Sequence, residues 1–178
     1  MPTAVIDTNV LLVANGSHAD VSDACRKACV QRLLAQQQHG VTVIDDAYRI
    51  LSEYQNRTNS SQGKLPGDAF LKWLLQNKAN PSRVHWIPIT ESAQDEFAEF
   101  PDAELQLRFD ASDRKFVAVA HAHPDKPPIW QAADCKWLDW WPALQAKGVT
   151  VDFVCPDDAR RFYATKYRKR SVPALPSA

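Results

Sequence analysis

The sequence predicts an α/β fold with a mostly parallel central sheet, and three observations support this prediction. Short apolar segments typical of strands alternate along the chain with longer segments of helical periodicity. Two of the strand-type segments, 4–6 and 128–132, lead to the aspartates Asp7 and Asp134. The 178 residues are 45% hydrophobic, which suffices for one domain with its own core.

Each expected element follows from a local pattern. Strands are expected at 4–6, 41–44, 83–89, 128–132 and 149–154, which makes five. Helices are expected at about 20–38, 46–56, 67–77, 91–99, 112–122, 135–146 and 157–167. Gly40 ends the first helix, Pro88 places its strand near a sheet edge, and Thr90 is the expected N-cap of helix 91–99. Because strands and helices alternate, right-handed crossovers should connect parallel strands.

The composition disfavours several classes of protein. The 21 basic residues balance the 21 acidic ones, which argues against a strongly basic nucleic-acid coat but leaves room for a local basic patch. No apolar run reaches the ~18 residues of a membrane helix, and the N-terminus enters a strand without a basic and apolar leader. We therefore expect a cytoplasmic protein without membrane contact.

The four cysteines are expected to be reduced and mostly buried. Cys25 and Cys29 are one helical turn apart, and neighbours on a helix rarely meet disulfide geometry. Cys135 and Cys155 lie far away in the sequence, and no CxxC pair is present. The spacing therefore disfavours a structural zinc site.

Two aspartates should meet at one edge of the sheet. Ligands of open α/β sheets bind outside the carboxyl ends of the strands, where Asp7 and Asp134 are expected. The alternative is that each aspartate opens an Asx turn after its strand. That alternative explains one such residue more easily than two.

Three further acids belong to the candidate site. Glu53 borders the apolar stripe of its helix, where a salt bridge to Arg49 or Arg57 is the alternative. Asp113 projects on the apolar side of the helix expected at 112–122, where N-terminal capping is an equally weighted alternative. For Asp110 we favour capping, or a supporting role beside the ligands.

The chemistry of such a cluster points to a divalent cation. Carboxylates in close proximity raise one another's pKa, and a bound cation reverses that effect. Hard ions such as Mg²⁺ and Mn²⁺ prefer oxygen ligands, and they promote phosphodiester hydrolysis by activating water. We therefore predict Asp7, Glu53, Asp113 and Asp134 as metal ligands and catalytic residues, with Asp110 as a fifth candidate ligand.

At this point the sequence resembles the PIN-domain family of nucleases over about residues 3–156. The resemblance rests on four segments in the same order: Ile6 to Leu11 with its Asp-Thr-Asn, Arg49 to Tyr54, Asp110 to Ala120, and Ala133-Asp134. It implies a Rossmann-like three-layer α/β/α sandwich and a nuclease domain at 1–156. The basic helix and Pro-containing tail at 157–178 are expected to belong to the same domain.

The resemblance also implies an activity and partners. The family is a group of Mg²⁺- or Mn²⁺-dependent ribonucleases, so the products would carry a 3′-hydroxyl and a 5′-phosphate. Asp7, Glu53, Asp113 and Asp134 match its four metal-site acids, and Thr8 or Asn9 matches a polar position that orients the first acid or contacts substrate. Many bacterial members are toxins held inactive by an antitoxin protein. An antitoxin, and a homodimer, therefore stay open as partners.

Cationic residues supply the expected contacts to RNA. Where some relatives carry another acid after the last one, this chain has Lys136, which we expect to contact a phosphate. The segment 160–170 is basic and interleaved with aromatic residues, which suits single-stranded RNA, and we expect Arg168, Lys169 and Arg170 to bind it. The alternative is a terminal helix that packs its aromatic side chains on the sheet.

The sequence thus favours a metal-dependent endoribonuclease. The main alternative is a binding module of the same fold, with a weak or lost metal site, that acts on RNA or protein. A phosphatase with an aspartyl nucleophile is disfavoured, because such enzymes need a second Asp two residues after the first, where this chain has Asn9.

Overall fold

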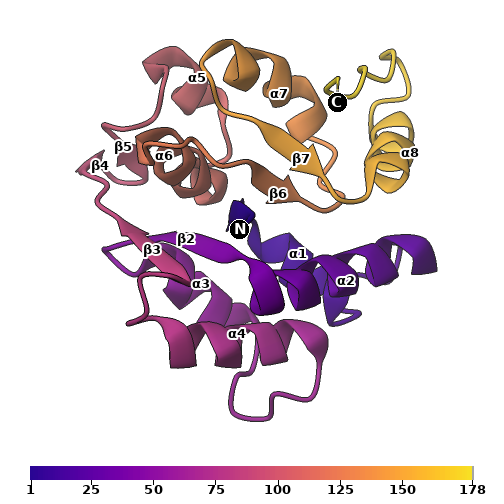
Figure 1. Cartoon of the computed structure of the whole chain (residues 1–178). Coiled ribbons are helices and arrows are strands. Elements are labelled where there is room, and N and C mark those ends of the chain that lie inside the picture. The colour runs from indigo at the N-terminus through magenta and orange to yellow at the C-terminus, as the bar shows by residue number, and fades with distance from the viewer. Residues whose placement is uncertain (178) are drawn as a thin grey trace.

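A computed structural model describes residues 1–177 and contains a five-stranded, fully parallel sheet (Figure 1). The strands lie in the order β3-β2-β1-β6-β7. They span β1 (Thr3–Ile6), β2 (Val41–Asp45), β3 (Val84–Ile87), β6 (Ile129–Gln131) and β7 (Val151–Phe153). The predicted α/β class, the five-stranded sheet and the edge position of the third strand are confirmed.

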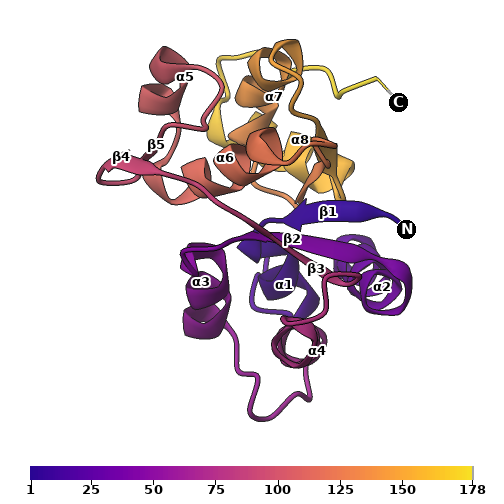
Figure 2. The same cartoon turned by 60° about the vertical axis from the view of Figure 1, so that its left-hand side comes forward.

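Helices cover both faces of the sheet and complete three layers (Figures 1 and 2). One layer consists of α1 (Thr8–Ala14), α2 (Asp23–His39), α3 (Arg49–Arg57) and α4 (Pro66–Asn77). The other consists of α5 (Ala103–Arg108), α6 (Arg114–Ala122), α7 (Trp137–Ala146) and α8 (Pro156–Lys166). A single 3₁₀ turn, η1 (Ala111–Asp113), precedes α6.

The sheet is buried because helices cover both of its faces. Every residue of β2 and β6 is buried, and so are the last three residues of β1. Such strands read as continuous apolar runs instead of alternating ones, as the sequence showed for 4–6 and 41–44. The same burial makes the polar residues that follow these strands conspicuous.

Three parts of the secondary structure differ from the prediction, and one of them is α5, which was not expected. Helix α1 was not expected, because Thr8 and Asn9 are weak helix formers, but the Asp7 carboxylate caps it by accepting a 2.9 Å hydrogen bond from Asn9 N. The helix expected at 91–99 is wrong. That segment forms the antiparallel pair β4 (Glu91–Ala93) and β5 (Glu96–Phe97), and Asp95 turns the chain between them with φ of 55°.

The expectation that all four cysteines are reduced is also wrong. Cys25 of α2 and Cys155, which precedes α8, form a disulfide across 130 residues of sequence. Only tertiary structure brings these two positions together, so their sequence spacing carried no signal. Cys29 and Cys135 are free and buried, as expected. Within residues 1–177, no helix has both the length and the apolar character needed to cross a membrane.

Candidate functional site

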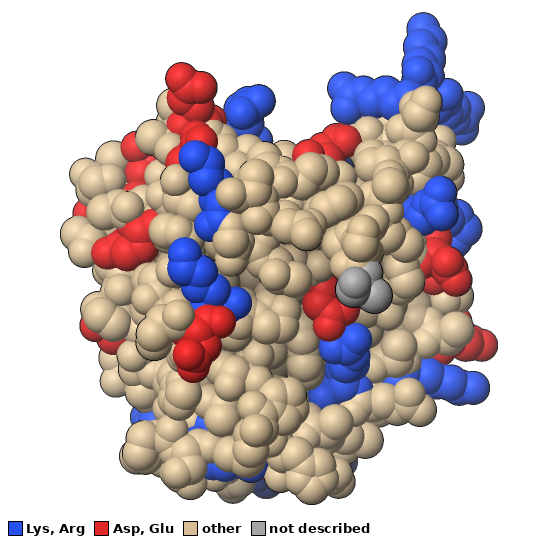
Figure 3. Space-filling view, turned by 45° about the horizontal axis from the view of Figure 1, so that its top comes forward, with Lys and Arg blue, Asp and Glu red and all other residues tan. Residues whose placement is uncertain are grey.

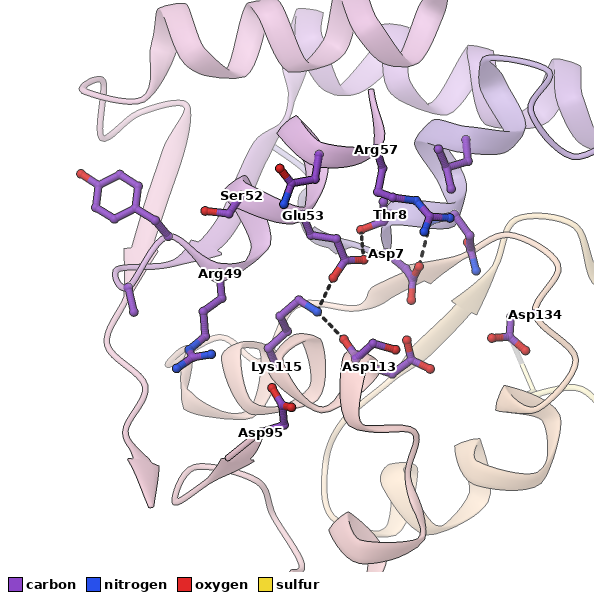
Figure 4. Close-up of a pocket in the computed structure, with 16 residues that line it drawn as sticks. Asp7, Thr8, Arg49, Ser52, Glu53, Arg57, Asp95, Asp113, Lys115 and Asp134 are labelled. Atoms are coloured by element: carbon purple, nitrogen blue, oxygen red, sulfur yellow. Dashed lines mark hydrogen bonds and ion pairs between the residues drawn. The ribbon is translucent and has the colours of Figure 1, made fainter. Parts of the chain in front are cut away.

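The candidate site lies beside β1, where the order of strands along the chain switches from one side of the sheet to the other. Strand β1 is flanked by β2 on one side and by β6 on the other, so the chain leaves β1 at a topological switch point. A cavity of about 790 Å³ opens there, beside the carboxyl ends of these strands. Asp7, Glu53, Asp113 and Asp134 all line it, although they come from four separate segments (Figure 4).

Asp7 is the most buried of these acids, with 5% of its surface exposed. Burial raises its pKa to about 7, against the lowering effect of the Asn9 N–H, and the nearby charges of Asp134 and Glu53 raise it further. The Asx-turn alternative is therefore correct in part, because Asp7 does bond Asn9 N, but that bond does not offset the cost of burial.

Asp113 has a still higher pKa of about 8. Burial is the main cause, and the charges of Asp7, Asp134 and Asp110 add to it. The capping alternative fails for Asp113, because its carboxylate accepts no capping hydrogen bond at the start of α6. The buried Asp7 and the half-buried Asp113 thus face one cavity, where a bound cation would stabilise their ionised forms.

Glu53 is held by two neighbours rather than by the arginines of its own helix. Thr8 Oγ1 donates a 2.6 Å hydrogen bond to Glu53 Oε1, and the Lys115 ammonium forms an ion pair with Oε2 (Figure 4). The salt-bridge alternative to Arg49 or Arg57 is wrong, since Arg49 pairs with Glu91 instead. Both oxygens of Glu53 are therefore engaged inside the cavity.

Asn9 and Gln131 join the start of α1 to the end of β6 beside the cavity. Gln131 Nε2 donates to Asp7 Oδ2 at 3.1 Å, and Asn9 Nδ2 donates to Gln131 Oε1. Asn9 Oδ1 in turn accepts a 3.0 Å hydrogen bond from Ala132 N. This network fixes the Asp7 carboxylate and leaves both of its oxygens with free lone pairs toward the cavity.

Asp134 and Asp110 differ from Asp7 and Asp113 in their surroundings. Asp134 is half-buried, accepts a 3.1 Å hydrogen bond from Lys136 N, and lies apart from the other acids in Figure 4. Asp110 caps no helix and does not line the cavity; it pairs with the Lys136 ammonium. Lys136 is likewise outside the lining, so the structure places both residues beside the site.

The acids share a cavity but do not form a compact ligand set. Among residues 1–177, no three carboxyl groups offer oxygens that all lie within 4.8 Å of one another. Lys115 occupies part of the space, with its ammonium on Glu53 Oε2 and on the Ser112 carbonyl. Because the donors are carboxylate oxygens that do not converge, the set suits a hard divalent ion that retains several waters.

Lys115 and Gln131 were missed by sequence reasoning. Lys115 is only 8% exposed, which is rare for lysine, but a lysine on a helix ordinarily reads as a solvated residue. Gln131 ends a buried strand two residues before Ala133, and its polar side chain there was the available signal. The only reason in the sequence to expect Lys115 in the cavity was that four acids in one place need a positive charge beside them.

A second cavity continues from the first one. It has a volume of about 400 Å³ and shares Asn9, Arg57 and Asp134 with the first. His18 and Phe162 also line it, with their rings stacked at 5.6 Å between centroids. The two cavities together form a path from the acids to an aromatic surface.

The basic C-terminal residues lie away from this path. Arg168, Lys169 and Arg170 follow α8, are exposed, and are absent from the lining of either cavity. Tyr163 is buried, and Phe162 and Tyr167 pack against the core, as the packing alternative expected. On the face in Figure 3, acidic and basic side chains are mixed, except for a cluster of basic side chains at one corner.

Comparisons with protein-family models, with curated proteins and with solved structures gave no match.

Proposed function

We propose that this protein is a metal-dependent endoribonuclease of the PIN type. The observation that carries the proposal is the pair Asp7, which is buried, and Asp113, which is half-buried; burial raises the pKa of both carboxyl groups, and both face one solvent-open cavity at the switch point of a parallel sheet. Neither makes an ion pair within 4.0 Å among residues 1–177. Such groups cost stability as anions unless a cation binds them.

The residues present fit Mg²⁺ or Mn²⁺. Asp7 and Asp113 would hold the ion, with Asp134 at the rim and Glu53 as a ligand or as the group that orients the attacking water. When bound, the ion supplies Lewis-acid activation and charge neutralisation for phosphodiester hydrolysis. Asp110 is the weakest candidate, because Lys136 already pairs with it.

The chain's own residues would position the substrate. Thr8 fixes Glu53, so that its carboxylate is oriented before substrate arrives. Lys115 and Arg57 line the cavity as cations for phosphate oxygens, and Asn9 holds Gln131 against Asp7. The stacked His18 and Phe162 offer an aromatic face for an unpaired base, which favours single-stranded RNA.

A second candidate function is supported by Lys115. Its ammonium neutralises Glu53, and the carboxylates do not converge, so the cavity is partly compensated without an ion. These features favour a binding module for RNA or protein in which the metal site is weak or lost. Contacts from Lys136, Arg168, Lys169 and Arg170 would serve either function, and an antitoxin partner belongs to the nuclease reading.

Cleavage of a fluorescent single-stranded RNA, with Mn²⁺ or with a chelator, tests the proposal. The wild type should cleave only with Mn²⁺, and Asp7→Asn and Asp113→Asn should each reduce the rate by at least about 100-fold. Asp46→Asn is the matched control, since Asp46 also follows a strand but is exposed and outside the cavity lining.

The outcomes separate the two functions. No metal-dependent cleavage by folded wild-type protein, with RNA binding intact by fluorescence anisotropy, would favour the binding module. Full cleavage by Asp7→Asn would refute the assignment of the site. Loss of activity in Asp46→Asn as well would mean that these substitutions act through the fold.

A further inference from the structure

Three cysteines from distant parts of the chain meet at one buried point. Cys25 and Cys29 lie one turn apart on α2, and Cys155 stands between β7 and α8. Their sulfur atoms all lie within 4.8 Å of one another, and all three residues are buried. The proposed nuclease uses none of them, so this cysteine cluster (Cys25, Cys29 and Cys155) is a separate feature of the fold.

The disulfide accounts for only two of these residues. Cys29 Sγ lies 3.8 Å from Cys155 Sγ, although the Cys25–Cys155 bond needs no third sulfur. In a tetrahedral zinc–thiolate site with bonds of ~2.3 Å, neighbouring sulfurs are about 3.8 Å apart. The position of Cys29 therefore suits a shared metal ion once the disulfide is open.

The surroundings of the cluster favour a soft cation. Thiolate sulfur is a soft ligand, so a thiophilic ion is the cation that would displace the proton of the buried Cys29 thiol. A thiophilic ion replaces that proton directly, because a coordinating thiol is deprotonated. Cys155 also lies at the N-cap of α8, an eleven-residue helix whose N-terminal dipole stabilises a thiolate.

A fourth ligand position is open to solvent. A cavity of about 420 Å³ is lined by Cys25, Cys155 and Asp158. The Asp158 carboxylate is already engaged, since it accepts 2.7 Å hydrogen bonds from Ser22 N and Ser22 Oγ and pairs with Arg161 at 3.0 Å. The fourth ligand is therefore water or a small external ligand rather than this carboxylate.

We propose that the reduced chain binds one Zn²⁺ ion through Cys25, Cys29 and Cys155, and that the Cys25–Cys155 disulfide excludes this ion. Opening the disulfide takes two electrons and two protons and yields two thiols. A dithiol reductant supplies both and becomes a disulfide, whereas a phosphine supplies the electrons and becomes a phosphine oxide, with the two protons and the oxygen coming from water. Metal binding then releases the three thiol protons to solvent. In either state the cluster ties α2 to α8, segments 130 residues apart in sequence.

Titration with Co²⁺, a spectroscopic substitute for Zn²⁺, tests this proposal without any assay of nuclease activity. Protein reduced with a phosphine and freed of reductant without air should bind one Co²⁺ per chain. The spectrum should show a near-ultraviolet thiolate charge-transfer band and the intense visible bands of a tetrahedral ion, and Zn²⁺ should abolish both. Oxidised protein should show neither band.

Two variants locate the site. Cys29→Ser keeps both partners of the disulfide, so it should fold when oxidised and should bind Co²⁺ at least about tenfold more weakly when reduced. Cys135→Ser removes a buried free cysteine outside the cluster and should bind as the wild type does. If the reduced chain unfolds, added Co²⁺ should refold it.

Several results would overturn the proposal. Reduced protein without thiolate bands, whether folded or left unfolded by Co²⁺, would do so, as would equal binding by Cys29→Ser or by the oxidised chain. Co²⁺ in the acidic cavity gives no thiolate band, so failure here is distinguishable from failure of the proposed nuclease site.

Discussion

The carboxylate cavity and the cysteine cluster gather potential metal ligands in opposite ways. The acids come from four segments and line one open cavity, yet no three of the described carboxyl groups approach within 4.8 Å. The three cysteines meet that limit in the interior. Two of these sulfurs are joined by the disulfide and the third belongs to a neutral thiol, so the cluster is compact without a metal, whereas carboxylates repel one another and need a cation before they converge. Compactness in a metal-free state therefore does not measure how well a site suits its ion.

A second contrast lies among the buried acids themselves. Asp45 is fully buried, but its two oxygens accept hydrogen bonds from Arg49 N at 2.9 Å and Ile50 N at 2.8 Å, so it caps α3. Asp158 is matched by Ser22 and Arg161. Asp7 also accepts two hydrogen bonds, from Asn9 N and Gln131 Nε2, yet its pKa is raised to about 7, and the half-buried Asp113 makes no capping bond. Two carboxyl groups with raised pKa values at one solvent-open cavity are the feature that supports the proposed site.

The largest expected effect concerns the cysteine cluster. Adding a reductant to metal-free wild-type protein should lower its free energy of unfolding by about 2–5 kcal/mol, because the disulfide closes a loop of 130 residues. Urea denaturation with and without reductant measures this loss. Cys25→Ser should show no dependence on reductant, and Cys135→Ser should lose as much as the wild type. An unchanged wild-type midpoint would show that the disulfide does not contribute to stability.

A smaller effect should distinguish the cavity by its pH dependence. The folded-state pKa of Asp7, about 7, and of Asp113, about 8, exceed the ordinary value of 3.8, so the folded protein binds more protons than the unfolded chain between these values. Stability is therefore fully present below about pH 4 and is lost as the pH rises to about 8. The expected loss is on the order of 1–3 kcal/mol without divalent metal, well below the ~1.4 kcal/mol per pKa unit of the full shifts, because Asp113 is only half-buried and water in the open cavity screens both charges.

Thermal melting across this pH range measures the effect, and Mg²⁺ should reduce it by stabilising the ionised acids. Burial lowers the pKa of His123, so this residue makes the folded protein more stable as the pH rises through the acidic range, which is opposite to the effect of Asp7 and Asp113. The difference between wild type and Asp7→Asn removes that contribution. Parallel profiles for the two proteins would show that Asp7 is ionised at ordinary pH and that its burial is compensated.

The smallest expected effect shows whether Lys115 competes with the metal ion or holds Glu53 in position for it. If the ammonium competes with the metal ion, Lys115→Gln should tighten Mn²⁺ binding roughly fivefold, the equivalent of about 1 kcal/mol. Calorimetric titration measures the affinity, and Lys27→Gln on the exposed face of α2 is the control. Weaker binding by Lys115→Gln would instead mean that the lysine holds Glu53 in its productive position.

Much of the architecture was predictable because it depends on local patterns. Apolar runs ending in polar residues predicted the strands, and their alternation with helices predicted the parallel sheet. The convergence of Asp7 and Asp134 at one cavity followed from strand polarity alone. The antiparallel pair at 91–97 was missed because a short polar segment takes its conformation from its packing partners rather than from its own propensity.

The site was predictable only in part. The acids were found because carboxylates after buried strands are unusual, but the partners that Lys115, Gln131 and Thr8 supply depend on rotamers and distances across 45 to 124 residues. The expected arginine pairs of Glu53 failed for the same reason, since a cation from another helix lay closer.

The sequence by itself determined the fold class, the strands that are followed by polar residues, and the acids that reach the cavity. It could do so because periodicity and strand direction depend on residues close together in the chain. The tertiary structure alone decided that Cys25 and Cys155 would bond and that Cys29 would lie beside them. It also decided that Lys115 would enter the acidic cavity. Contacts between distant segments depend on how helices pack on the sheet, and residue spacing along the chain carries no record of that packing.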